Sequence, residues 1–372
     1  MKIPDNLYII KTTNAYTYLL NINQKNRRWL YTTLFKHAPS HALWFILPVS
    51  ANRLKRKGRK NMPANQPYVE QSVKRENPVL RFLNSRKVVP YIFIAPFIIS
   101  FLVLTVYPAV RGIIMSFQKV LPGQIEFVGL ANYSRVFNPT FFKALSNTTV
   151  YVILTVTILT IVPIILAVIL DSKFSRFKTL FRASLFMPAL ASTIVAGMIF
   201  RLMFGETESA AANQFIAWFG LDPINWRYHA WSGMFLMVML CVWRWLGVNI
   251  LYFLAALQNV PNELYEAAEI DGATIFQKFR YVTLPFLKPV TIFVVTISVI
   301  NGFRMFEESF VFWEVGSPNN IGLTVVGYIY QQGIQQNDMG FGAAVGVILM
   351  LIIFVVSIIQ LFLTGAFKRG DE

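Results

Sequence analysis

The sequence predicts an all-α integral membrane protein with about six transmembrane helices. Of its 372 residues 55% are hydrophobic and only 14% are charged, and the mean hydropathy is +0.51. A soluble domain normally carries about a quarter charged residues, so this composition indicates a membrane protein. Apolar segments of membrane-spanning length alternate with short polar connections, and Lys and Arg gather in every second connection.

The excess of basic residues belongs to the N-terminal part of the chain. Residues 1–90 hold 17 Lys and Arg against three acidic residues, whereas the whole chain has a net charge of +16. The remainder is therefore nearly neutral, which argues against a nucleic-acid-binding face on the folded body. One cysteine, Cys241, and three scattered histidines exclude a disulfide framework and a histidine metal site.

Residues 1–61 show neither helical nor alternating periodicity, and residues 53–60 form a dense basic run. Three interpretations compete: attraction to anionic headgroups, electrostatic contact with nucleic acid, or a leader outside the natural protein, with Met62 as the true start. We favour the third, so residues 1–61 are expected to be disordered or foreign. Residues 62–87 then form a cytoplasmic segment, and residues 88–372 form the transmembrane body.

Six spans follow from hydropathy, four of them with internal or terminal prolines. They cover residues 88–115, 147–170, 180–204, 231–257, 289–313 and 341–362. Arg201 near the end of the third span is expected to snorkel toward headgroups. The tryptophans and tyrosine at 226, 228 and 231 predict an interfacial aromatic belt. Gly342 and Gly346 predict close helix packing.

The orientation follows from the basic residues near the span ends. The N-terminal segment, the loop at 171–178, the loop at 261–288 and the C-terminal tail are rich in Lys and Arg, and the other connections are not. The positive-inside rule therefore places both termini and the loop at 261–288 in the cytoplasm.

The polar interruption at 261–285 carries the clearest helix signals. Pro261 suits a first helical turn, Glu263 and Glu266 complement the helix dipole, and Gly272 suits a left-handed turn at the helix end. A second amphipathic segment, 275–282, leads back to the membrane. We expect two short helices that form a compact knob on the cytoplasmic face.

The spacing within this knob resembles the EAA loop of ABC-importer membrane subunits of the carbohydrate-uptake branch. The matching residues are Glu266-Ala267-Ala268, Gly272, Val282 and Leu284-Pro285, with Val282 where the family usually has isoleucine. Two further stretches, 129–133 and 316–330, resemble the family's "GLxNY" and "TxGGP" segments, although Glu314 and Ser317 depart from the second pattern. The resemblance implies an ABC type I importer permease fold in a bacterial plasma (inner) membrane.

The same resemblance implies roles and partners. The knob would dock on an ATPase through Glu266, Ala267, Ala268, Asp271 and Gly272. The partners would be a second homologous permease, a dimer of ATP-binding cassette ATPases and an extracytoplasmic sugar-binding protein. The chain carries no phosphate-binding loop and no hydrolase motif, so no catalytic residue, metal or cofactor is expected and ATP hydrolysis is assigned to the partner.

Polar residues inside the spans are the candidates for a sugar path, since ionisable groups in hydrocarbon are costly unless they face a cavity or a partner. We select Arg244, Trp245 and Asn249 on the fourth span and Asn301, Arg304 and Glu307 on the fifth. Arg304 precedes Glu307 and Glu308 by three and four residues, so they are expected to pair along one helix face. Structural pairing or packing is the competing interpretation for each.

Other functions stay open at this level. The acidic and basic residues of the fifth span could form the proton relay of an ion-coupled secondary transporter, and sugar and glycerol-phosphate importers share these motifs. The sequence identifies neither the sugar nor the pocket residues, nor whether the second permease is a different chain.

Overall fold

The computed structural model describes residues 7–11, 17–21, 85, 87–121, 123–171, 178–314 and 316–365. The chain divides into two units, Met1–Arg81 and Phe82–Glu372. In the first unit, β1 (Leu7–Lys11) pairs with antiparallel β2 (Thr17–Asn21), an element that the sequence did not predict. The basic run at 53–60 and residues 62–84 lie outside the described residues, so the interpretations of the leader stay predictions.

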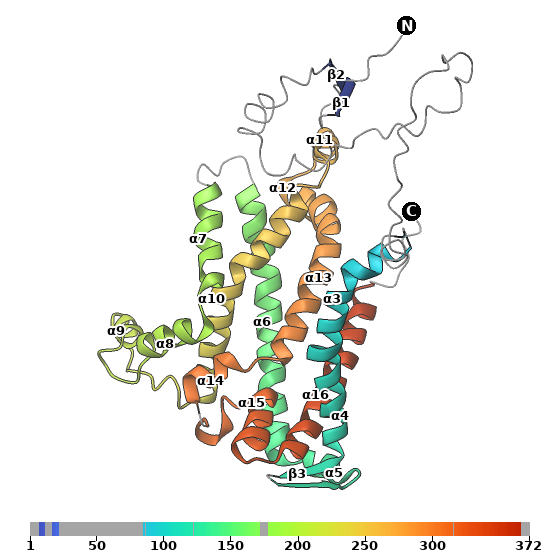
Figure 1. Cartoon of the computed structure of the whole chain (residues 1–372). Coiled ribbons are helices and arrows are strands. Elements are labelled where there is room, and N and C mark those ends of the chain that lie inside the picture. Colours follow the sequence, from blue (N-terminus) through green and yellow to red (C-terminus); the bar gives the residue numbers. More distant parts are fainter. Residues whose placement is uncertain are drawn as a thin grey trace, which may run out of the picture. The chain divides into compact units, whose positions relative to one another are not determined.

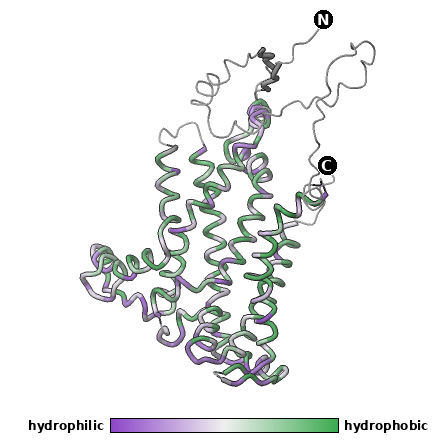
Figure 2. The backbone as a smooth tube through the Cα atoms, in the orientation of Figure 1, coloured by the Kyte–Doolittle hydropathy of each residue, from purple (hydrophilic) through white to green (hydrophobic). Residues whose placement is uncertain are grey.

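The second unit is built from long apolar helices. Its described residues contain five helices long and apolar enough to cross a membrane, or six if α7 and α8 count as one span. This agrees with the six predicted spans, and hydrophobic residues line the helices in Figure 2. The five are α3 to α4 (Val89–Ser116, with the π-helical turn η3 at Leu102–Val106), α6 (Pro139–Asp171), α10 (Ala230–Leu257), Ile275–Trp313 (which contains α13, Leu284–Phe303) and α16 (Met339–Leu363).

The third predicted span is not a single straight helix. α7 (Lys178–Leu190) and α8 (Thr193–Met203) meet at a bend of 97°. Pro188 lies in the last turn of α7, where it lacks the N–H that would continue the ladder, and Ser192 adopts an extended backbone before α8. The hydropathy pattern shows no such turn because both arms are apolar.

Shorter elements lie at the two ends of the long helices (Figure 1). One end, called the loop end here, holds α11 (Asn262–Ile270) and α12 (Ile275–Lys278). The opposite end holds β3 (Gln118–Leu121), β4 (Gln124–Phe127), α5 (Ala131–Val136), α14 (Glu307–Trp313), η5 (Pro318–Asn320), α15 (Val325–Tyr330) and η6 (Gln331–Gln335). The segment that connects α8 to α10 also belongs to this opposite end, and it contains α9 (Ala211–Ala217).

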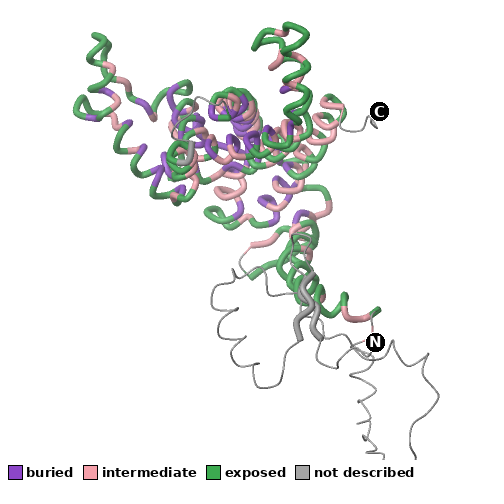
Figure 3. Tube along the Cα trace, turned by 90° about the horizontal axis from the view of Figure 1, so that it is seen from above, coloured by how far each residue is buried: buried purple, intermediate pink, exposed green. Residues whose placement is uncertain are grey.

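Helices α6 and α10 form the centre of the unit and pack together along their length. The buried side chains form two hydrophobic clusters, a larger one centred on Tyr151, Phe141 and Phe312 and a smaller one toward the loop end around Phe253 and Leu287. α3 has no buried residue, and α4 packs against α16 with one side only. The apolar residues of the first span are therefore mostly exposed (Figure 3). Outward-facing apolar surface of this kind suits lipid.

Two glycines allow the broken helix to approach its neighbours. A Cβ at Gly247 of α10 would collide with the Leu185 carbonyl of α7, and one at Gly197 of α8 would collide with Val311 of α14. Both arms of the α7–α8 bend therefore pack closely against another helix, because each contact includes a glycine without a side chain. Gly342 likewise meets Gly333 of the same chain, so the predicted close packing at Gly342 is internal, while Gly346 has only a loose contact with Ile329.

Candidate functional site

The first helix of the loop begins and ends where the sequence predicts. Pro261 is the N-cap of α11, with an extended backbone, rather than a residue of its first turn. Asp271 is the C-cap, and Gly272 has a φ of +73°, the left-handed conformation that glycine adopts without strain. The turn therefore depends on Gly272, as expected.

The second helix of the loop differs from the prediction of a separate short helix. The hydroxyl of Thr274 accepts from the Gln277 N–H, and the Gln277 side chain accepts from the Thr274 N–H, which forms a capping box. From this cap, α12 continues through the π-helical turn η4 (Phe279–Thr283) directly into α13. The loop and the fifth span are thus one uninterrupted helical path, because Pro285 falls in the first turn of α13, where a proline is tolerated.

The surface of the loop is strongly apolar for an exposed segment. Glu266 and Ala267 are exposed and Ala268 is half-buried. Four large apolar side chains beside them have high exposed fractions: Ile275 88%, Ile270 87%, Tyr281 74% and Phe276 73%. This exposed cluster, called the knob surface below, lies at the loop end, where charged residues also gather, and an apolar patch of this kind marks an interaction site.

Few contacts hold the loop against the rest of the unit. Lys278 and Glu269 form an ion pair of 2.6 Å across the two short helices, and the hydroxyls of Tyr265 and Thr283 lie 2.9 Å apart. Both contacts join one part of the loop to another. The loop is therefore shaped by its own caps and turn.

Of the predicted path residues, Arg244 has the most distinctive surroundings. It lies at the middle of the 28-residue helix α10, and its guanidinium stacks over Trp245 with 5.6 Å between the Arg244 Cζ and the ring centroid. One terminal nitrogen donates to the Ala191 carbonyl at the α7–α8 bend over 3.3 Å. Its Nε is buried and has no hydrogen-bond partner in the described part of the chain.

A buried polar cluster adjoins Arg244. Glu308 of α14 is 8% exposed, and the charge of Arg244 acts on it and on Tyr151 of α6 and Cys241 of α10. Tyr151 and Cys241 share a hydrogen bond. Tyr151 and Cys241 were not predicted to belong to this cluster, because a tyrosine or a cysteine inside an apolar span does not stand out from the hydropathy pattern.

The predicted pairing of Arg304 with the two glutamates is wrong. α13 ends at Phe303, Arg304 is its C-cap, and α14 starts at Glu307, so the three residues do not share a continuous helix face. Arg304 and Glu307 are exposed, and no ion pair joins Arg304 to either glutamate among the described residues. The break separates Arg304 from Glu307 and Glu308, which both belong to α14.

The other predicted path residues do not converge on one point. Asn249 is buried and donates to the Leu159 carbonyl of α6 over 3.3 Å, which is a packing role. Asn301 and Trp245 are exposed on their helices. The structure therefore brings only Arg244 and Trp245 together from the predicted set, and their roles in transport stay predictions.

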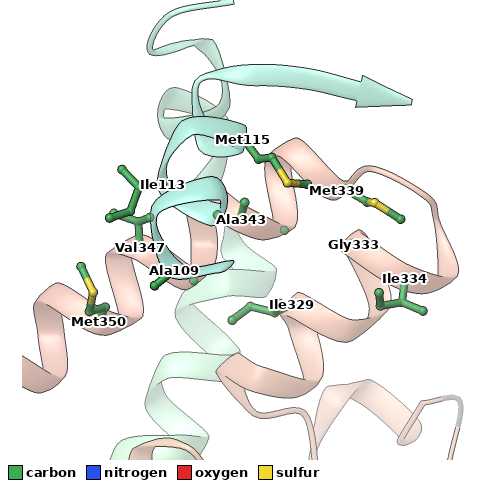
Figure 4. A pocket seen from close by; sticks show the side chains of 13 residues that line it. Ala109, Ile113, Met115, Ile329, Gly333, Ile334, Met339, Ala343, Val347 and Met350 are labelled. Atoms are coloured by element: carbon green, nitrogen blue, oxygen red, sulfur yellow. The ribbon is translucent and has the colours of Figure 1, made fainter. Parts of the chain in front are cut away.

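An apolar groove of about 430 Å³ lies between α4, η6 and α16 (Figure 4). Its floor contains glycines and alanines and its walls are formed by methionine, isoleucine and valine side chains. The lining includes no charged residue, so it offers nothing to bind sugar hydroxyls. Its lining residues are Ala109, Gly112, Ile113, Met115, Ile329, Gly333, Ile334, Met339, Gly342, Ala343, Gly346, Val347 and Met350.

At the opposite end, the segment between α8 and α10 is organised by Asn213. Its amide donates to the carbonyls of Gly205, Thr207 and Ile224, and its oxygen accepts from the Ile224 N–H and the Trp226 indole. Trp226 is buried against Phe204, with ring centroids 5.1 Å apart, so it does not belong to the predicted interfacial belt.

One ion pair lies within this segment and another lies beside it. Arg227 makes a bidentate pair with Glu206, at 2.6 and 2.8 Å, and also donates to the Phe312 carbonyl of α14. The hydrogen bond to Arg227 lowers the pKa of Glu206, and the same bond raises the pKa of Arg227. Arg201, predicted to snorkel, pairs with Glu314 at 2.7 Å, and Glu314 has a positive φ of 47°.

The long apolar helices agree with the comparisons to known proteins. The model of the family described as "Binding-protein-dependent transport system inner membrane component" matches residues 69–369. The chain belongs to this family. It is therefore a non-catalytic membrane subunit of an ABC-type importer, and the ion-coupled secondary transporter considered above is excluded.

Relatives of this permease include sugar transport proteins. It is 68% identical over 307 residues to the arabinooligosaccharides transport system permease protein AraP of Halalkalibacterium halodurans, covering 82% of this chain and 97% of that protein. AraP of Bacillus subtilis is 58% identical over 284 residues, covering 76% and 91%. The lactose transport system permease LacF of Rhizobium radiobacter is 32% identical over 277 residues, covering 73% and 92%.

Solved structures share the permease fold. A chain of a bacterial ABC transporter that imports the acidic polysaccharide alginate matches with a TM-score of 0.69 and 20% identity, covering 80% of this chain and 100% of that chain. A second structure of an alginate transporter, in complex with a substrate-bound periplasmic protein, matches with a TM-score of 0.69 and 19% identity. At this identity the likeness concerns the fold.

Proposed function

We propose that this permease forms the membrane path of an ATP-driven importer of neutral oligosaccharides that contain arabinose. The substrate class is supported by the 68% and 58% identity to permeases named for arabinooligosaccharide transport. Relatives named for lactose and glycerol 3-phosphate transport are much less similar, at 32% and 28% identity.

The observation that carries the coupling mechanism is the knob surface. Its four apolar side chains are exposed, and Glu266 is exposed on α11, the helix that also carries Ile270. We assign this surface to a cytoplasmic ATPase, with both termini on the cytoplasmic side as the basic residues at the loop end favour. Ala267 and Ala268 allow close approach, Gly272 sets the angle between the two helices, and Asp271 closes the first helix.

The remaining partners are proposed from membership of the family. A second homologous permease would complete the path, a dimer of ATPases would drive it, and an extracytoplasmic binding protein would deliver the sugar to the opposite end. In the path, Arg244 would donate hydrogen bonds to hydroxyls and Trp245 would offer a ring face to the sugar. No sugar contact is assigned to Asn249, which packs against α6, or to Asn301, Arg304 and Glu307. Alternation between inward- and outward-open states would follow movement of the loop.

The coupling assignment is tested with the assembled importer in lipid vesicles. Glu266→Lys and Gly272→Pro are expected to leave insertion intact but to lower ATP-dependent uptake at least tenfold, since each changes the docking surface. Glu263→Gln, in the first turn of the same helix, is the matched control. Full uptake by either of the first two variants would contradict the assignment.

The substrate assignment is tested by competition. Unlabelled arabino-oligosaccharide is expected to suppress uptake of a labelled arabinotriose, whereas glycerol 3-phosphate at the same concentration is not. Equal competition by glycerol 3-phosphate would instead favour the substrate class of the relative named for glycerol 3-phosphate transport.

A further inference from the structure

The apolar groove between α4, η6 and α16 is long and narrow (Figure 4). On α16 its lining residues follow helical spacing from Met339 to Met350, so they form one stripe along that helix. At a rise of 1.5 Å per residue this stripe is about 16 Å long. The groove volume of about 430 Å³ over this length corresponds to a mean cross-section of roughly 26 Å².

This cross-section is too small to admit a helix. An α-helix with its side chains is about 10 Å across and therefore needs a cross-section of about 80 Å². A single extended hydrocarbon chain, one methylene group wide, fits the shape of the groove. The lining contains no charged residue, so it also fits the chemistry of such a chain.

Glycines keep the groove open. Its floor includes Gly333 and Gly342, which approach so closely that a Cβ at Gly342 would lie 2.9 Å from the Gly333 Cα. Gly112 of α4 has no atom within 4 Å of an added Cβ, and Gly346 of α16 has only the Ile329 side chain, at 3.9 Å. A larger residue at Gly112 or Gly346 would therefore fill the groove without a backbone collision.

The groove is continuous with the apolar outer surface of the first span. Its α4 wall belongs to the span Val89–Ser116, whose most apolar window has no buried residue. Four side chains that line the groove are themselves 40–57% exposed: Ile113, Ile334, Met339 and Met350. Lipid around the first span can therefore enter the groove from the side.

A basic residue of α4 lies beside the groove at the depth of the lipid headgroups. Arg111 is exposed, and it lies in sequence between the lining residues Ala109 and Gly112. No ion pair joins it to an acidic residue in the described part of the chain. The first span has 28 residues, about 42 Å, and so exceeds the hydrocarbon core of about 30 Å. Arg111, five residues before the end of α4 at Ser116, therefore lies near the boundary with the headgroups, where a guanidinium attracts phosphate.

We propose that this groove binds one acyl chain of a phospholipid whose phosphate pairs with Arg111. The lipid comes from the leaflet at the opposite end, which is the outer leaflet in the proposed orientation. Its chain extends from Met339 toward Met350, and the guanidinium donates hydrogen bonds to the phosphate oxygens. The lipid thereby contacts the first and the last span together. This binding does not depend on which sugar the importer carries.

The experiment uses the assembled importer in a non-ionic detergent without phosphate, with a trace of phosphatidylglycerol that carries a diazirine at the end of one acyl chain. After irradiation, mass spectrometry locates the attachment sites. Attachment near Val347 and Met350 is expected to be at least fivefold higher than attachment on α3, which has no groove. A diazirine close to the carboxyl end of the chain is expected to move the attachment to Met115 and Met339.

Variants separate the groove from the charge. Gly112→Leu fills the groove and Arg111→Gln removes the charge, and each is expected to lower attachment in the groove at least fivefold. The matched controls are Ala183→Leu, at an exposed alanine of α7, and Lys143→Gln, at an exposed lysine near the start of α6. Both controls are expected to stay within twofold of the wild type.

A diacylglycerol with the same diazirine chain but no phosphate tests the role of Arg111 directly. Gly112→Leu is expected to lower its attachment as well, whereas Arg111→Gln is expected to leave it within twofold of the wild type. An equal loss with both lipids in Arg111→Gln would contradict the phosphate contact.

Two further outcomes would overturn the proposal. Attachment in the groove that does not exceed attachment on α3 would show that the groove makes only general lipid contact or is covered by another subunit. Equal attachment in Gly112→Leu and Ala183→Leu would show that the chain binds elsewhere. If Gly112→Leu does not assemble, Gly346→Leu fills the same groove from α16 and gives the same test.

Discussion

Two polar segments at opposite ends of the same helices are stabilised in different ways. The segment between α8 and α10 satisfies its own polar groups: Asn213 makes five hydrogen bonds within it, Trp226 is buried, and Arg227 is paired. The loop at 261–283 has well-formed caps, but it leaves Ile275 and Phe276 exposed. The first segment is complete within this chain, whereas the second presents a surface that another protein can cover.

The strongest test of this comparison is Asn213→Ala. The substitution leaves the Trp226 indole, the Ile224 N–H and several carbonyls without a partner, and it is expected to lower the free energy of unfolding by about 3 kcal/mol. Hydrogen exchange of residues 205–228 in the purified complex is the measurement. Unchanged protection there would show that the segment does not depend on its internal hydrogen bonds.

A substitution on the knob surface should weaken binding of the ATPase without lowering the stability of the permease. Phe276→Asp is expected to weaken capture of the ATPase by at least tenfold, about 1.4 kcal/mol, because it places a charge on the apolar contact surface. The thermal unfolding midpoint of the isolated permease should not change, since Phe276 is exposed. Phe219→Asp, an exposed apolar residue at the opposite end, is the control for a general loss of hydrophobicity.

The turn between the two loop helices has a smaller predicted effect. Gly272→Ala is expected to cost about 1 kcal/mol, because φ is +73° while no atom lies within 4 Å of the added Cβ. The cost is therefore conformational rather than steric. Exchange of the amide hydrogens in α11 and α12 should rise locally. Exchange in α6 and α10 should be unaffected, and a global increase would contradict this account.

The smallest effect concerns pH and the pair Arg227–Glu206. The pKa of Glu206 is lowered in the folded protein, so the pair contributes stability above the ordinary value of 4.5 and loses it as pH falls through the lowered pKa. Wild type and Glu206→Gln should therefore differ in unfolding temperature at neutral pH, by an amount equivalent to about 1 kcal/mol or less. The difference should shrink in strongly acidic buffer, and a difference that grows there would have the wrong sign.

Hydropathy predicts where the long helices lie, and the glycine at 272 predicts the turn that ends α11. Spans 231–257 and 341–362 agree with α10 and α16 to within two residues at each end. Most positions in these segments are apolar over a membrane-spanning length, so tertiary contacts add little to the signal.

The helix breaks and the polar cluster could not be predicted in the same way. The α7–α8 bend lies within an apolar run, and its two arms pack against α10 and α14 through Gly247 and Gly197. The interruption at Arg304 lies in a polar stretch, where α13 ends. The predicted pairing of Arg304 with Glu307 failed because it assumed a continuous helix. Glu308 and Tyr151 are 157 residues apart in sequence, so only the fold brings both within reach of the Arg244 charge.

The continuity of α12, η4 and α13 has a mechanical consequence. From the cap at Thr274 to the break after Phe303 the backbone forms a single strut, roughly 40 Å long at a rise of 1.5 Å per residue. A strut without a flexible joint transmits torque and axial displacement alike. A push delivered at one end is therefore transmitted to the other end, where α13 ends five residues before Glu308.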